Sequence, residues 1–299
     1  MIARYPPTWD TTPRPISDNH AWVEYPDNGT RNNRQRMSNT ALLAATASVV
    51  SVNVSISDRT LPIVSRYAAK NTEAVMAMIS PEPNAAGVNA IIMACNTSCA
   101  TAAEFGWPHS QAPVLDLIES AAIAVESGGY LNVGVVATAA TARSGAYAEA
   151  IGALCERTHV TEIGAPALVP LVEARKIYGE EPRAAVAAVC ANLPRDVDSV
   201  VLACTHYPLL ESHFAAVLGP DVALIDPALV HAERAVRLVA GLGIPAGSGA
   251  TLCMTSGNLE AFRENLITLV GDIEPAVLAA SWSDGVGAAI ELAREGAGG

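Results

Sequence analysis

Two cysteines of the chain follow apolar runs in closely similar surroundings. Cys95 comes after Ile91–Ala94 and precedes an asparagine and a threonine, whereas Cys204 comes after Val201–Ala203 and precedes a threonine and a histidine. Each cysteine is expected to stand at the start of a helix, where exposed amide groups and the helix dipole favour a thiolate over a thiol and also bind carboxylates. Two such thiols facing one cleft could remove a proton from one face of a carbon atom and return it to the other. The pattern therefore indicates stereoinversion at carbon.

The other four cysteines are expected to be small buried hydrophobic residues. Cys99 lies one helical turn after Cys95, but no cluster of carboxylates or histidines accompanies them, and the spacing is not that of a zinc site. The chain also has no glycine-rich nucleotide motif and no lysine in a pyridoxal context. We therefore expect neither a metal nor a cofactor.

Short apolar runs alternate with longer helical segments along the chain, which predicts βαβ units, parallel sheets and an α/β fold. The expected strands are 20–25, 48–56, 89–94, 132–137, 160–163, 199–203, 222–225 and 250–254, and the expected helices are 61–79, 114–127, 146–157, 184–192, 209–218, 228–240 and 259–269. The two cysteine segments lie about one domain's length apart. We therefore predict two similar α/β halves, each delivering a cysteine at the carboxyl end of a strand, where open α/β sheets bind ligands.

Composition narrows the class of protein further. The chain has 299 residues, of which 51% are hydrophobic, and a formal net charge of −12. Because nucleic acids and anionic membranes bind clustered lysine and arginine, neither is an expected partner. Six cysteines are too few for a disulfide scaffold, and the first residues contain no apolar segment typical of a secretory signal. We expect a cytoplasmic enzyme with free thiols.

The two cysteine segments resemble the signatures of the cofactor-independent aspartate/glutamate racemases. Ala94–Thr97 reads Ala-Cys-Asn-Thr, and Cys204–Leu209 reads Cys-Thr-His-Tyr-Pro-Leu, which is highly specific. Similar segments also occur at 134–147, 168–173, 224–227 and 255–257. The resemblance covers residues 20–282.

The resemblance implies two flavodoxin-like domains, each a doubly wound and mainly parallel α/β sheet, related by pseudo-twofold symmetry with the active site in the cleft between them. The first domain would consist of residues 19–118 and 228–282 and carry Cys95, and the second, residues 119–227, would carry Cys204. Residues 1–18 would be an extended lead-in and residues 283–299 a C-terminal tail.

The resemblance also assigns catalytic roles. Cys95 and Cys204 would be the two acid/base residues, one for each face of the substrate. Glu173 and His206 match positions that assist the second thiol, and Asp27 is the expected partner of the first.

Substrate-binding roles follow from the same resemblance. The α-carboxylate and ammonium groups of the substrate would be held by Asn96, Thr97, Thr141 and Thr205. Two further contacts are expected from the first two loops, which depart from the family pattern. Asn28 stands where the family has a serine, and Pro62 is kept without the tyrosine and glycine that normally follow it.

The expected function is therefore cofactor-independent racemisation of an amino acid. The segment Cys204–Leu209 favours the glutamate branch, which would supply D-glutamate for peptidoglycan. Aspartate, another amino acid or a hydantoin as substrate, and a degenerate paralogue that only binds an amino acid, are the alternatives. A decarboxylase that uses one cysteine is disfavoured because both are present. The expected partner is a small-molecule amino acid, and a homodimer is left open.

Overall fold

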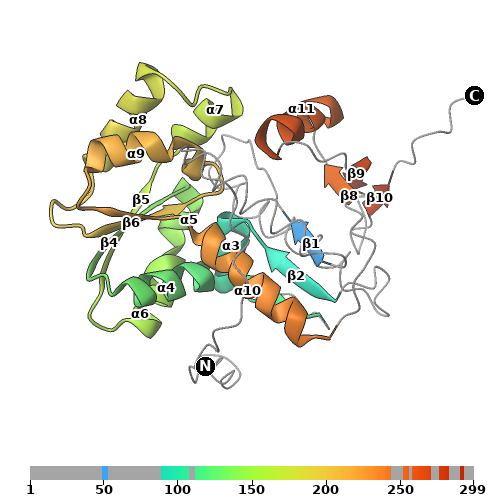
Figure 1. The fold of residues 1–299 in the computed structure, drawn as a ribbon, viewed down its shortest axis with the longest axis horizontal. Helices are drawn as coiled ribbons and strands as arrows, with labels where there is room; N and C mark the ends of the chain where they lie inside the picture. Colours follow the sequence, from blue (N-terminus) through green and yellow to red (C-terminus); the bar gives the residue numbers. More distant parts are fainter. Residues whose placement is uncertain are drawn as a thin grey trace, which may run out of the picture. The chain divides into compact units, whose positions relative to one another are not determined.

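The computed structural model describes residues 49–52, 89–107, 112–243, 252–255, 258–270, 276–282 and 290–292. These residues form three sheets covered by helices (Figure 1). The largest sheet is parallel throughout and has the strand order β5-β4-β6-β7. Its strands are β4 (Asn132–Ala137), β5 (His159–Gly164), β6 (Ser199–Ala203) and β7 (Ala223–Ile225).

The helices that connect these strands lie on both faces of the sheet. They are α5 (Ala139–Ser144), α6 (Ala146–Leu154), α7 (Leu168–Glu173), α8 (Glu180–Cys190), the 3₁₀ helix η1 (Tyr207–Leu210) and α9 (Glu211–Leu218). Figure 1 shows α8 and α9 on one face and α6 on the other, together with α4 (Leu117–Gly128).

Alternation along the central strands explains how one sheet supplies two cores. Val133 and Val135 of β4 pack with Val201 of β6 in the core beneath α4 and α6. The intervening residues, Val136 of β4 and Val200 of β6, pack in the core beneath α7, α8 and α9. Because successive side chains of a strand point to opposite faces, continuously apolar strands are buried on both sides.

A second parallel sheet carries the segment of Cys95. Its order is β1-β2-β3, with β1 (Val49–Val52), β2 (Ala90–Met93) and β3 (Val114–Asp116). Strand β2 leads into α3 (Asn96–Phe105), and β3 leads into α4. One face of β2 joins the core beneath α4 and α6, and the other packs against α10 (Pro227–Gly241).

The third sheet contains β8 (Leu252–Thr255), β9 (Ala276–Trp282) and β10 (Ile290–Leu292), and α11 (Leu259–Val270) follows β8. Strands β8 and β9 are parallel, whereas β9 and β10 are antiparallel. Strand β10 lies within the region expected to be a C-terminal tail.

The parallel sheets and their helices confirm the predicted α/β class. Strands β4 and β6 have the predicted bounds, but the helix predicted over 114–127 was wrong at its start, since residues 114–116 form β3. The carboxylate of Asp116 accepts a hydrogen bond from the amide of Ile118 at 2.8 Å, so the helix begins only after this cap. The predicted strand 20–25 and helix 61–79 lie outside the described residues. The domain bounds and the pseudo-twofold relation remain predictions.

A buried polar cluster joins α4 to α10. The hydroxyl of Ser120 lies 2.8 Å from Nδ1 of His231 and accepts a hydrogen bond from Arg234 at 2.7 Å. Arg234 also pairs with Glu119 at 2.6 Å. His231 is only 1% exposed, and its burial, together with the charge of Arg234, lowers its pKa to about 3. The imidazole is therefore neutral at physiological pH.

This cluster predicts a loss of stability in acid. A free histidine has a pKa near ~6.5, so between that value and about 3 the unfolded chain takes up a proton that the folded chain excludes. Lowering the pH from 6 to 4 should cost the folded protein about 2 to 3 kcal/mol through this group. Urea denaturation of the native chain and of His231→Asn across this range measures the difference. An equal decline in both proteins would contradict the prediction.

Candidate active site

The carboxyl edge of the largest sheet places two polar segments side by side. Ala137 of β4 pairs in register with Ala203 of β6, and the chain continues from them to Thr138 and Cys204. The connections from β4 lead to β5 on one side and then back across to β6 on the other. The carboxyl edge at such a switch point is the ligand-binding crevice of open α/β sheets.

Cys204 is a buried thiol at this edge. The residue is 6% exposed, and its Sγ lies 3.7 Å from Nδ1 of His206. Burial raises the pKa of Cys204 to about 12, with smaller contributions in the same direction from Cys95 and Glu173, whereas the backbone amide of His206 opposes the rise. The thiol therefore holds its proton at neutral pH.

His206 connects this thiol to a carboxylate. Its Nε2 lies 3.5 Å from Oε1 of Glu173, the last residue of α7. Burial lowers the pKa of His206, and the neighbouring Glu173 carboxylate raises it in opposition. With the proton of the neutral ring on Nε2 and directed at Glu173, the lone pair of Nδ1 faces the thiol of Cys204. The three side chains thus form a line along which a proton can leave or reach the sulfur.

Cys95 is the residue immediately before α3. It is 8% exposed and stands at the N-cap position, so the first amide groups of the helix follow it directly. Asn96, the next residue, is 4% exposed, and its Oδ1 accepts a hydrogen bond from the hydroxyl of Tyr147. Unpaired amide groups at a helix N-terminus attract anions.

Three threonine hydroxyls form a closed cluster beside this helix. Oγ1 of Thr97 lies 3.1 Å from Oγ1 of both Thr138 and Thr141, which are 3.0 Å from each other. Thr138 also caps α5 by accepting a hydrogen bond from the amide of Thr141 at 3.3 Å. The cluster joins the first turn of α3 to the first turn of α5.

The structure brings together several of the residues that the sequence singled out. His206 contacts Cys204 through one ring nitrogen and Glu173 through the other. The hydroxyl of Thr97 lies within hydrogen-bond distance of the hydroxyl of Thr141. The side chain of Thr205 is exposed in the turn after β6. Three further predicted site residues, Asp27, Asn28 and Pro62, lie outside the described residues.

One expectation at Cys204 needs correction, and two contacts were missed. The segment after Cys204 was expected to begin a helix as α3 does, but a turn and η1 precede α9. An α-helix that began directly after Cys204 would use the amide proton of residue 208, and Pro208, in the first turn of η1, has no such proton. The contacts of Thr138 and Tyr147 were not predicted. Position could have indicated Thr138, because it follows β4 as Cys204 follows β6.

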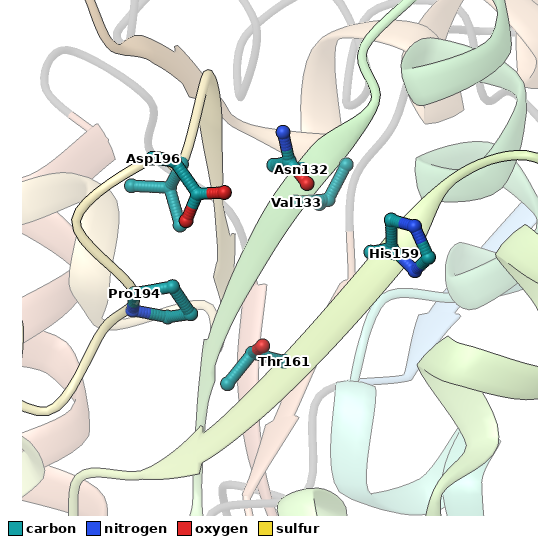
Figure 2. Close-up of a pocket in the computed structure, with 7 residues that line it drawn as sticks. Asn132, Val133, His159, Thr161, Pro194 and Asp196 are labelled. Carbon is teal, nitrogen blue, oxygen red and sulfur yellow. The ribbon is translucent and has the colours of Figure 1, made fainter.

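The opposite edge of the same sheet holds a small pocket. Figure 2 shows Asn132, His159 and Thr161 on strands β4 and β5, with Pro194 and Asp196 across from them. The volume of this pocket is about 260 Å³. Asn132 and His159 are the first residues of their strands, so this pocket lies at the amino edge. It contains none of the predicted site residues.

Among the described residues, no group of three or more histidine, cysteine, aspartate or glutamate side chains is arranged to hold a metal ion. No helix in the described part of the chain is long and apolar enough to cross a membrane.

Comparison with known proteins connects this geometry to a family. Residues 34–235 match the model of the Asp/Glu/hydantoin racemases. A glutamate racemase of Desulforudis audaxviator is 38% identical over 188 residues, which are 59% of this chain and 69% of that protein. A glutamate racemase of Streptococcus equi is 42% identical over 142 residues, or 46% of this chain and 53% of that protein. The chain thus spans between half and little more than two thirds of these relatives.

Solved structures have the same fold. Glutamate racemase from Francisella tularensis, in complex with D-glutamate, has a TM-score of 0.66 and 21% identity, covering 82% of this chain and 93% of its own. Glutamate racemase from Thermus thermophilus, in complex with β-chloro-D-alanine, has a TM-score of 0.61 and 27% identity, with coverages of 81% and 91%. These matches confirm the resemblance stated from the sequence and the flavodoxin-like racemase fold.

The contact between Glu173 and His206 generates a prediction that does not depend on activity. Replacing the carboxylate by an amide in Glu173→Gln removes the charge that raises the pKa of His206, so this pKa should fall. NMR titration of the His206 ring measures it. Glu180→Gln, which changes an exposed glutamate at the start of α8, is the control. An unchanged His206 titration in Glu173→Gln would show that the two groups do not interact.

Proposed function

The chain belongs to the Asp/Glu/hydantoin racemase family, and on that premise we propose that it interconverts L- and D-glutamate with two cysteines and no cofactor. The proposal rests on one observation above all: a buried, protonated thiol, Cys204, lies in line with His206 and Glu173. The names of the relatives support glutamate as the substrate. Such an enzyme would supply D-glutamate for peptidoglycan.

The proposed reaction moves one proton off the α-carbon and another onto it. When Cys204 starts as the protonated residue, Cys95 removes the α-proton from one face, and Cys204 gives its proton to the opposite face. The C–H bond breaks as the S–H bond of Cys95 forms, and the S–H bond of Cys204 breaks as the new C–H bond forms. The reverse direction exchanges the two roles. His206, backed by Glu173, then takes or returns the proton of Cys204.

The α-proton of an amino acid is weakly acidic, so the carbanion-like transition state needs stabilisation. Negative charge develops on the substrate carboxylate, and preorganised hydrogen-bond donors can stabilise it there. In this proposal the donors are the first amide groups of α3 and the side chains of Asn96 and Thr97. Their attraction for the carboxylate is stronger in a buried site than in water.

Several parts of the proposal depend on residues outside the described ranges. Asp27, Asn28 and Pro62 are proposed to complete the first face and the side-chain end of the pocket. Thr205 and Thr141, which lie within the described ranges, are proposed to contact the substrate. Aspartate, another amino acid or a hydantoin is the alternative substrate, because the loops that contain Asn28 and Pro62 depart from the family pattern. Cofactor independence, a homodimer and a cytoplasmic location remain predictions.

Incubation in D₂O tests the proposal directly. The purified chain, without added cofactor, should exchange the α-hydrogen of glutamate for deuterium and invert both enantiomers, as followed by NMR and by circular dichroism. Cys95→Ser and Cys204→Ser should each lower the rate of inversion by at least about a thousandfold, because each removes one of the two acid/base groups. Absence of exchange with every amino acid tested would contradict the racemase proposal.

A matched control separates loss of the reacting thiol from loss of any cysteine. Cys155 is a partly exposed cysteine that follows α6, so Cys155→Ser should retain the activity of the native chain. The same assay with aspartate and a 5-substituted hydantoin decides the substrate. Inversion of either of these without inversion of glutamate would replace glutamate as the substrate and leave the mechanism intact.

A further inference from the structure

We propose that Tyr147 is a positioning residue that fixes the side-chain amide of Asn96 with its N–H donors available to the substrate carboxylate. The inference rests on the proposed function, since it concerns how that same site recognises an anionic amino acid. It assigns a role to a fully buried side chain that neither reacts nor contacts the substrate.

The contact that carries the inference joins elements from different sheets. Tyr147 is the second residue of α6, which lies between strands β4 and β5 of the largest sheet. Asn96 is the first residue of α3, which follows β2 of the second sheet. Gly145 separates α5 from α6 with a φ of 70°, a left-handed conformation that glycine adopts without strain. Both Tyr147 and Asn96 are buried, at 0% and 4% exposure, and the phenol hydroxyl bonds to Oδ1 of Asn96.

The direction of this hydrogen bond is fixed by chemistry. A phenol hydroxyl has one proton to donate, and an amide oxygen can only accept. Burial raises the pKa of Tyr147 well above its ordinary value, so the hydroxyl keeps that proton at neutral pH. The structure places Oδ1 of Asn96 toward Tyr147, so the two N–H groups of Nδ2 remain for other partners.

Orientation matters because an asparagine amide has nearly the same shape after a 180° turn. Only its hydrogen bonds decide whether nitrogen or oxygen occupies a given side. A carboxylate is attracted by the N–H groups and repelled by the carbonyl oxygen. By holding the oxygen, Tyr147 gives the residue next to Cys95 the polarity that an anionic substrate requires. Without the hydroxyl, the turned amide would compete, and part of the protein would present the wrong atom.

Tyr207 offers a matched comparison within the same chain. It is also 0% exposed, but its hydroxyl donates to backbone carbonyls, those of Ala165 at 2.9 Å and Ala137 at 3.2 Å. Loss of that hydroxyl affects packing and backbone hydrogen bonding but does not release a side-chain amide. A purely structural role for Tyr147 would make the two tyrosines behave alike.

The first experiment compares the two tyrosine-to-phenylalanine variants by steady-state racemisation of glutamate. In Tyr147→Phe the KM should rise about tenfold and kcat should fall as well, because the amide of Asn96 is proposed both to bind the carboxylate and to stabilise the charge that develops on it. In Tyr207→Phe the thermal midpoint should fall by a similar amount as in Tyr147→Phe, with KM unchanged. An unchanged KM in Tyr147→Phe, or an equal rise in both variants, would overturn the inference.

The second experiment tests whether Tyr147 acts through Asn96. In an Asn96→Ala background, Tyr147→Phe should raise KM no further, because the amide that the hydroxyl orients is absent. A further tenfold rise in that background would show that Tyr147 acts on the substrate by another route and would overturn the inference.

Binding without turnover distinguishes failure of the inference from failure of the proposed function. The Cys95→Ser/Cys204→Ser double variant should bind D-glutamate in isothermal titration calorimetry, and Tyr147→Phe should weaken that binding about tenfold. Weakened binding together with an inactive native chain would refute the racemase and support the role of Tyr147. Normal turnover of the native chain together with unweakened binding in Tyr147→Phe would support the racemase and refute the role of Tyr147. Absence of both turnover and binding would overturn both.

Discussion

Parallel pairing of β4 with β6 is the constraint on which the site depends. Since Ala137 lies opposite Ala203, the chain leaves both strands at the same level, and the residues that follow arrive at one edge. The buried strands must satisfy their backbone groups within the sheet, β4 with β5 and β6, and β6 with β4 and β7. The polar segments after them are therefore placed by the hydrogen bonding of a sheet whose own side chains take no part in chemistry.

Sequence reasoning located the elements that are determined locally. The strands β4 and β6 are apolar runs bounded by turn residues, and their bounds were predicted correctly. The start of α4 was not, because Val114 and Leu115 continue the apolar pattern of the helix, and their pairing with Ile91 and Ile92 of β2 is a long-range contact. Short strands beside helices are decided by tertiary neighbours rather than by pattern.

The site shows the same division between local and long-range information. Cys95 and Cys204 could be found because each stands in a recognisable short segment. The partners Thr138 and Tyr147 lie in a segment that the sequence marks as similar to the family. Their contacts with Thr97 and Asn96, however, join residues that are 41 and 51 positions apart in the chain. No periodicity carries that information, since it depends on how α3 meets α5 and α6. The roles of Asp27, Asn28 and Pro62 rest on the sequence alone.

The core beneath α4 and α6 contains residues of β2 as well as residues of β4 and β6, so two sheets share one apolar interior. Neither sheet can expose its inner face without exposing part of the other. Their free energies of unfolding are consequently coupled, and the protein is expected to lose both sheets in one cooperative transition rather than in two. A cavity made under α4 would weaken the segment of Cys95 and the segment of Cys204 together, at a distance from either sulfur.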